Sequence, residues 1–170
     1  MRRVLVTGFG AFSDHTVNPT ESLVRTWPTT MVVRDPWTDA SEPVEVEARL
    51  LSVDASGAAE TAQRLTDGAR WDAILHLGLC GTCSHARLEW MGRDRLTMRV
   101  PDNAGRHVTD APITGSGDLA AGVDRDRFGL AQCDTDASWS DDAGGYVCNE
   151  TLHQTLAACS GMASPPPVLF

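Results

Sequence analysis

The chain has 170 residues, enough for one domain with a hydrophobic core, and its 42% hydrophobic and 22% charged residues are typical of a globular protein. Its net charge of -9 argues against a nucleic-acid groove or an anionic membrane surface, because both attract clustered Lys and Arg. No apolar run reaches membrane-spanning length, and the N-terminus lacks the apolar core and cleavage site of a signal peptide. The simplest expectation is a single-domain cytoplasmic protein.

The chain opens with a short apolar run at residues 4–6, which predicts a buried first strand. Asn18 then caps a predicted helix that runs to about Thr26. Gly8 and Gly10 between these elements suggest a dinucleotide-binding turn. However, Ser13 stands where the third glycine of that motif belongs, and the helix starts too late, so we reject this interpretation.

The middle of the chain predicts a strand–helix–strand unit. Residues 44–51 alternate between apolar and polar, residues 56–70 carry apolar residues at helical spacing, and residues 71–78 form an apolar run. Short connections between such elements indicate a parallel or mixed sheet covered by helices. Ligands collect at the carboxyl ends of strands in these sheets, which directs attention to the residues after Val6 and Leu77.

The second half is less regular. Residues 95–100 alternate and predict a strand that ends in a turn at Pro101. Residues 115–142 are the least organised, with a short helix possible around 124–130. Their acidic end resembles the start of a calcium loop but lacks its glycine and closing glutamate, which favours a solvated loop. A helix is predicted over residues 149–158, and a last strand begins at Val168.

Cys148 lies between a Gly-rich turn and the predicted helix start. Unpaired backbone N–H groups and the helix dipole at such a position favour the thiolate, which is the nucleophilic form of cysteine. Gly144 and Gly145 allow a tight turn and a close approach of substrate to the backbone. Cysteine is also one of the most frequently buried residues, so a packing role is the simpler alternative.

The other cysteines permit a second kind of chemistry. Cys80 and Cys83 form a C-x-x-C motif, which suits a redox pair or half of a zinc site. No second pair stands at metal-ligand spacing, and His85 is one residue too late for haem attachment, so two small residues in a tight loop are the simpler interpretation. An odd number of cysteines in a chain of this length favours reduced thiols. The five are Cys80, Cys83, Cys133, Cys148 and Cys159.

Five segments occur in an order that resembles the pyrrolidone carboxyl peptidases, the intracellular pyroglutamyl peptidases. They are VLVTGFGAF with the following NP, LHLGL, LEW, RVPDNAG and AGGYVCN. The resemblance implies a three-layer α/β/α sandwich around a twisted mixed sheet, formed by residues 1–170 as one domain. It also implies a cytoplasmic cysteine peptidase, commonly a tetramer, that removes N-terminal pyroglutamate from peptides and needs no metal or organic cofactor.

The resemblance assigns roles to single residues. Cys148 matches the nucleophile, Glu89 the acidic member of a Cys-His-Glu triad, and Arg99 an arginine near the active centre that would support the oxyanion. The thiolate would attack the carbonyl that follows pyroglutamate and form a thioester, helped by a histidine that Glu89 orients. By their types alone, Glu89 and Arg99 suit solvated strand positions equally well.

Three further residues match positions that hold the pyroglutamyl ring. Two aromatic faces from Phe9 and Phe12 would hold the flat, neutral lactam, and the amide of Asn18 would pair with its polar edge. The alternatives are core packing for the two phenylalanines and a helix cap for Asn18.

One departure from the family pattern concerns the triad histidine. The family places it just inside the strand after the nucleophile's helix, and here that strand runs from Val168 to Phe170. The resemblance therefore predicts that the triad histidine and the family's C-terminal helix are not present in this chain. Loss of the general base lowers the catalytic rate of a triad enzyme by several orders of magnitude.

Three hypotheses remain: a pyroglutamyl peptidase whose histidine comes from elsewhere, an inactive homologue that keeps the pyroglutamyl pocket, and a redox or metal protein that uses Cys80 and Cys83.

Overall fold

The fold is described from a computed structural model, which describes residues 1–35, 37–130 and 136–170. Cys133 and the start of the polar run that follows it lie outside the described residues. The helices and strands are β1 (Arg2–Phe9), α1 (Pro19–Thr26), β2 (Thr30–Arg34), β3 (Ser41–Leu51), α2 (Ala55–Thr66), β4 (Ala73–His76), β5 (Ala86–Glu89), β6 (Met91–Gly92), β7 (Leu119–Ala120), α3 (Arg125–Phe128), β8 (Ala137–Ser140), α4 (Val147–Cys159) and β9 (Val168–Leu169).

The main sheet has the strand order β2-β3-β1-β4-β9. Strands β3, β1, β4 and β9 run parallel, and β2 pairs antiparallel with β3 at the edge. The sheet is therefore mixed. The strand–helix–strand unit predicted from residues 44–78 is confirmed as β3, α2 and β4, because α2 forms the crossover that parallel strands require.

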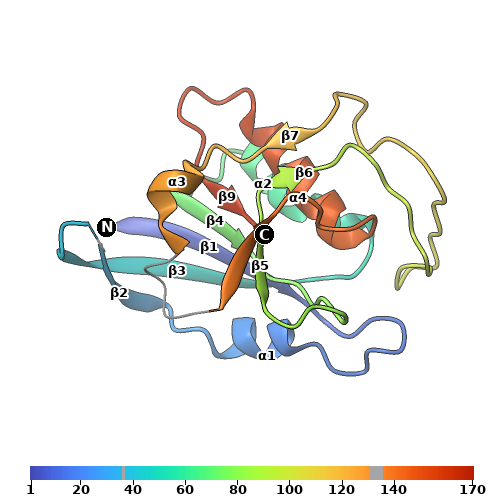
Figure 1. Ribbon diagram of the computed structural model, residues 1–170, viewed down its shortest axis with the longest axis horizontal. Helices are drawn as coiled ribbons and strands as arrows, with labels where there is room; N and C mark the ends of the chain where they lie inside the picture. Colours follow the sequence, from blue (N-terminus) through green and yellow to red (C-terminus); the bar gives the residue numbers. More distant parts are fainter. Residues whose placement is uncertain (36, 131–135) are drawn as a thin grey trace.

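Helices cover both faces of this sheet (Figure 1), with α1 on one side and α2 and α4 on the other. Successive residues of β1 point to opposite faces, so Leu5 packs in the cluster that contains Leu152 of α4, whereas Val6 packs with Val24 of α1. This burial on both faces explains the continuous apolar run of β1. The predicted three-layer α/β/α sandwich is confirmed.

Two short parallel strands, β5 and β8, extend the fold beyond β9. The backbone N–H of Glu89 at the end of β5 donates to the carbonyl of Phe170 at 2.8 Å, and the N–H of Phe170 donates to the carbonyl of Glu89 at 3.2 Å. Neither β5 nor β8 was predicted, because four residues are too few to show a period and their partners lie about fifty positions away. The described part of the chain contains no helix long and apolar enough to cross a membrane.

The predicted strand over residues 95–100 is wrong. Only an isolated bridge joins Leu96 to Ala111, although Leu96 and Met98 are buried as the alternation indicated. The backbone N–H of Thr97 donates to the carbonyl of Gly145 at 2.9 Å, and the Asn149 side chain donates to the carbonyl of Arg95 at 3.0 Å. The N–H groups of Leu96 and Met98 donate instead to the carbonyls of residues 111 and 108. The segment therefore divides its backbone hydrogen bonds between the loop at 108–111 and the start of α4 with its preceding loop.

Asp94 holds the loop after residue 112. Its carboxylate accepts backbone N–H bonds from Ile113, Thr114 and Gly115 through Oδ1 and from Gly117 through Oδ2, at 2.8 to 3.2 Å. These bonds lower the pKa of Asp94 to about 2, with the bond from Thr114 as the main cause. The depressed pKa means that ionised Asp94 stabilises the folded state.

Asp94→Asn is expected to lower the free energy of unfolding by about 2 kcal/mol at pH 7, because neutral acceptors make weaker hydrogen bonds than a carboxylate. The stabilisation is present above about pH 4 and is lost as the pH falls toward 2, so the difference between the two proteins should shrink over that range. Urea denaturation at pH 7 and at pH 3 measures it. A difference that does not depend on pH would contradict the electrostatic cause.

Candidate active site

Cys148 lies in the first turn of α4, close to the helix start that the sequence predicted. The turn before it depends on glycine. Gly144 has a φ of 83°, and a Cβ on Gly145 would lie 2.6 Å from the carbonyl oxygen of Thr97. The sequence Gly-Gly-Tyr-Val-Cys therefore brings the chain into the helix while it packs against the segment around Thr97.

Burial raises the pKa of the Cys148 thiol to about 12. The backbone N–H at the start of α4 acts in the opposite direction, and the negative charge of Glu89 adds to the rise. The expected thiolate is therefore wrong for this structure, because loss of hydration costs the anion more than the helix start returns. The thiol is neutral at physiological pH and needs a base to become a nucleophile.

The thiol lies at the carboxyl end of β4, close to the end of β9. A Cβ on Gly78 would lie 3.1 Å from Sγ of Cys148 and 2.6 Å from two ring carbons of Phe170, so only glycine fits between them. The Phe170 ring also stacks on Phe9 at a centroid distance of 6.4 Å. The site therefore forms at the edge of the sheet that the strand pattern indicated.

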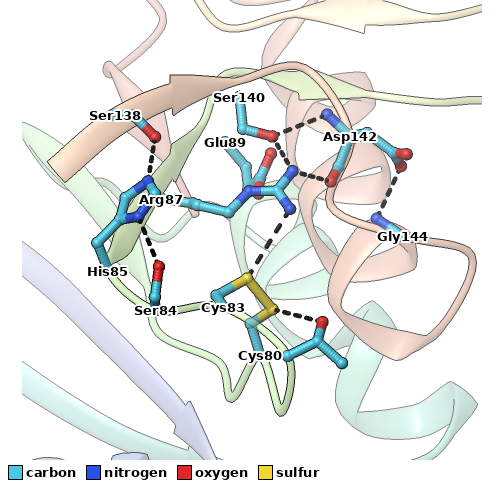
Figure 2. The surroundings of a disulfide bond; sticks show 11 residues. Cys80, Cys83, Ser84, His85, Arg87, Glu89, Ser138, Ser140, Asp142 and Gly144 are labelled. Carbon is cyan, nitrogen blue, oxygen red and sulfur yellow. Dashed lines mark hydrogen bonds and ion pairs between the residues drawn. A yellow bond between two sulfur atoms is a disulfide. The ribbon is translucent and has the colours of Figure 1, made fainter.

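Glu89 is 6% exposed, and its backbone pairs with that of Phe170. Its Oε1 forms an ion pair with Nε of Arg87 at 3.1 Å (Figure 2). Its Oε2 is buried, and no hydrogen-bond partner for it exists among the described residues. Glu89 thus brings a negative charge close enough to affect the Cys148 thiol, and one of its oxygens has unused acceptor capacity.

The predicted ring-binding residues meet at one pocket beside Cys148. Phe12 packs against Tyr146 and His15, with ring centroids 5.8 Å and 5.0 Å away. The pocket is lined by Phe9, Phe12, Asn18, Val53, Leu79, Tyr146, Val147 and Cys148. The structure therefore brings together residues of the first loop and the nucleophile helix, which lie more than 120 positions apart in sequence.

Asn18 makes three side-chain hydrogen bonds, two with Thr20 in the first turn of α1 and one with Gly10 in the preceding loop. Its Oδ1 accepts hydrogen bonds from N and Oγ1 of Thr20, and its Nδ2 donates to the carbonyl of Gly10 at 3.0 Å. The expected helix cap on α1 is present. Within the described residues, the second N–H of the Asn18 amide has no acceptor, so it is the polar group that Asn18 can offer to a ligand in the pocket.

A family model described as Pyroglutamyl peptidase matches residues 2–166. The chain belongs to the pyroglutamyl peptidase family. It is therefore by family a cysteine peptidase. The pyrrolidone-carboxylate peptidase of Chromobacterium violaceum is 31% identical over 160 residues, which cover 92% of this chain and 72% of the relative. The corresponding protein of Pyrococcus furiosus is 27% identical over 158 residues, covering 91% and 72%.

Solved structures of pyroglutamyl peptidases share the fold. The pyrrolidone carboxyl peptidase of Thermococcus litoralis superposes with a TM-score of 0.85 at 25% identity, covering 100% of this chain and 75% of that one. The enzyme of Thermus thermophilus gives a TM-score of 0.75 at 29% identity, covering 98% and 82%. The resemblance inferred from the five sequence segments is confirmed.

Two matched family residues, Glu89 and Arg99, do not line the pocket. Arg99 also differs from Glu89 in its surroundings. The Arg99 side chain is exposed, and no ion pair or hydrogen bond joins it to another described residue. Its proposed support of the oxyanion requires the side chain to reach toward Cys148 when substrate is present.

In the described part of this pyroglutamyl peptidase homologue, each of the five histidines contacts groups other than Cys148. His76 lies in β4 between the hydroxyls of Thr7 and Thr155, at 2.7 and 3.1 Å, and burial lowers its pKa to about 3. His153 lies between the carbonyl of Gly92 and the hydroxyl of Thr114. His15 packs against the ring of Phe12, His85 contacts the hydroxyls of Ser84 and Ser138, and His107 contacts the carbonyl of Met98.

Sequence reasoning missed a buried ion-pair network behind the nucleophile. Arg106 binds both carboxylate oxygens of Glu150 at 2.9 and 2.6 Å, and its Nε donates to Asp102 at 2.9 Å. Glu150 lies two residues after Cys148. Asn103, the residue after Asp102, donates from its side chain to the carbonyl of Ala11 in the loop that carries Phe12, at 2.9 Å. The network therefore joins the nucleophile helix to the loop that carries Phe12. An acidic residue in the first helical turn was the available signal, but its partner could not be identified.

Cys80 and Cys83 form a disulfide, so the expectation of reduced thiols is wrong for this pair. Cys148 and Cys159 are free, as expected. No group of three or more His, Cys, Asp or Glu residues able to hold a metal ion occurs in residues 1–35, 37–130 and 136–170. The zinc interpretation of the C-x-x-C motif therefore has no further ligands there.

Glu89→Gln is expected to lower the pKa of the Cys148 thiol, because the negative charge of Glu89 contributes to its rise. Alkylation of Cys148 by iodoacetamide at pH 9 should become roughly two- to fivefold faster. Peptide mass spectrometry over time measures the rate, with Glu45→Gln as the control, because the Glu45 side chain is 47% exposed. An unchanged rate would show that the Glu89 charge does not reach the thiol.

Proposed function

We propose that this chain removes N-terminal pyroglutamate from peptides, with Cys148 as the nucleophile. The observation that carries the proposal is the position of the Cys148 thiol in the wall of a pocket built from Phe9, Phe12 and Asn18. A lone cysteine at a helix start has many possible roles. A cysteine beside two aromatic rings and an available amide N–H suits an acyl group that is flat, neutral and polar at one edge.

The pocket has a volume of only about 10 Å³ in this structure, so its walls must move apart to admit a ligand. In the proposed complex, Phe9 and Phe12 then contact the faces of the lactam ring. The second N–H of the Asn18 amide donates to the ring carbonyl, while the first stays bonded to Gly10. The carbonyl that joins pyroglutamate to the next residue then points toward Sγ of Cys148. These contacts select the first residue of the peptide and make few demands on the second.

The proposed reaction starts from the neutral thiol. An imidazole oriented by Oε2 of Glu89 takes the thiol proton as sulfur attacks the carbonyl carbon, and backbone N–H groups at the start of α4, together with Arg99, stabilise the oxyanion. The imidazolium donates its proton to the leaving amine, and the carbon–nitrogen bond breaks to leave a thioester. Water, activated by the same imidazole, hydrolyses the thioester to free pyroglutamate and regenerates the thiol.

Glu89 supports this assignment through its place in the fold. The end of β9 is hydrogen-bonded to the Glu89 backbone, and the Phe170 ring lies beside the position of Cys148 across Gly78. The family resemblance assigns the triad histidine to this same strand, which Glu89 borders.

The second candidate function is binding of pyroglutamyl groups without turnover. The contacts of the five histidines favour it, because each histidine is held by other groups in the described residues.

Family resemblance also leads us to propose peptides with an N-terminal pyroglutamate as partners, a cytoplasmic location and assembly into a homo-oligomer, commonly a tetramer.

The test compares hydrolysis and binding in one protein. Release of a fluorescent amine from a pyroglutamyl amide is followed with and without added imidazole, and binding of pyroglutamate is measured by calorimetry. Turnover, alone or after addition of imidazole, supports the peptidase. Binding without turnover in either condition supports the second candidate. A folded chain that neither hydrolyses the amide nor binds pyroglutamate would overturn both.

A further inference from the structure

The Cys80–Cys83 disulfide lies in the loop that leaves β4, outside the pyroglutamyl pocket. Cys80 is exposed and Cys83 is partly buried, so small reductants can reach the bond. The bond closes a loop with a sequence separation of only 3 residues. Closure of such a short loop removes less chain entropy from the unfolded state than closure of a long one, so stabilisation explains this disulfide poorly.

A single arginine joins the disulfide to the candidate active site. Figure 2 shows the guanidinium of Arg87 between the disulfide and the β5–β8 pair. Nη1 of Arg87 lies 3.8 Å from Sγ of Cys83, and Nε lies 3.1 Å from Oε1 of Glu89. Nη2 contacts Oγ of Ser140 and donates to the carbonyl of Asp142 at 2.9 Å. Arg87 is therefore held in place with one nitrogen directed at Cys83.

We propose that Cys80 and Cys83 form a redox-active dithiol–disulfide pair, and that Arg87 favours its reduced form by stabilising the Cys83 thiolate. A disulfide sulfur is a weak acceptor, whereas a thiolate carries a full negative charge. Reduction thus converts a weak contact of Arg87 into a charge-assisted one.

The chemistry is thiol–disulfide exchange with a dithiol reductant. One thiolate of the reductant attacks Sγ of the exposed Cys80, a mixed disulfide forms, and the electron pair of the broken S–S bond leaves on Cys83 beside the Arg87 guanidinium. The second thiol of the reductant then displaces Cys80, so the reductant ends as a disulfide and the protein holds two thiols. Two electrons pass to the protein in all, with two protons when both products are neutral.

The same contact links the redox state of the pair to Glu89. In the oxidised protein, the only carboxylate paired with Arg87 in the described part of the chain is that of Glu89. In the reduced protein, the Cys83 thiolate becomes a second anionic partner and draws the guanidinium toward the loop. Any effect of this shift on the role of Glu89 in catalysis rests on the proposed function, whereas the proposal of a redox-active pair does not.

The experiment equilibrates the whole chain in mixtures of reduced and oxidised dithiothreitol at pH 6 and at pH 9, followed by trapping and peptide mass spectrometry of each cysteine. We expect Cys80 and Cys83 to be oxidised and reduced together. At pH 9, Arg87→Met should shift the equilibrium toward the disulfide by about three- to fivefold, the size of a partly exposed charge interaction. At pH 6 the shift should vanish, because both thiols are then neutral.

Two matched variants isolate the charge. Arg87→Lys should keep most of the wild-type behaviour, and Arg95→Met, which removes an exposed arginine paired with Asp110, should have no effect. If Cys80 and Cys83 stay reduced in oxidised dithiothreitol, the redox pair is refuted. An equal shift for Arg87→Met at both pH values would overturn the role of the Arg87 charge. Because these measurements need no turnover, their failure would leave the proposed peptidase untouched.

Discussion

Cys148→Ala is expected to lower kcat/KM for a pyroglutamyl amide by roughly a thousandfold or more, because removal of a nucleophile abolishes covalent catalysis. Cys159→Ala is the matched control. Cys159 is the other free cysteine found in the described residues, it lies at the far end of the same helix, and it is 4% exposed in the core. Its loss should cost about 1 kcal/mol of stability and leave kcat/KM within about threefold.

The two variants are compared by release of the fluorescent amine, under the imidazole concentration at which the wild-type chain is most active. Circular dichroism establishes that each variant is folded. Mass spectrometry of the wild-type protein quenched during turnover should show the acyl adduct on Cys148. Turnover that survives in Cys148→Ala would place the nucleophile elsewhere, and equal losses in both variants would indicate damage to α4.

Arg106→Met is expected to lower the free energy of unfolding by about 3 kcal/mol, because it leaves two buried carboxylates without their counter-charge. The Asp102 side chain is fully buried and that of Glu150 is 6% exposed. Arg106 donates three hydrogen bonds to these two carboxylates. They raise the pKa of its guanidinium, and the bonds to Glu150 are the largest cause. Methionine keeps much of the side-chain volume, so the loss reports mainly on charge.

Urea denaturation measures this loss, and a second substitution tests its cause. The double variant Arg106→Met with Glu150→Gln should recover part of the stability, since one of the two uncompensated charges is gone. Arg95→Met, which breaks the exposed pair with Asp110, should change stability by less than about 0.5 kcal/mol. A loss for Arg106→Met no larger than that of this control would show that the network contributes little.

Most of the main sheet could be predicted from the sequence, because its signals are local. The apolar run that includes Leu5 and Val6, the alternating β3 and the periodic α2 each show their structure within about ten residues. The segment around Leu96 has the same alternation yet is no strand, because its backbone hydrogen bonds are divided between the loop at 108–111 and the start of α4 with its preceding loop. Alternation reports which side chains are buried, and it does not identify the partner of the backbone.

The same division applies to the candidate site. The Gly-Gly turn, the helix start at Cys148 and the aromatic loop with Asn18 are short motifs, so the sequence by itself determined the candidate residues and the family to which the chain belongs. That they meet at one pocket, together with Val53 and Leu79, was decided by the tertiary structure. The raised pKa of Cys148 depends on what covers the thiol, and the ion pair of Arg106 with Glu150 joins positions 44 residues apart. Only the tertiary structure decided these properties and the pairing of Cys80 with Cys83, because solvent exclusion and charge contacts depend on distances in space rather than on order along the chain.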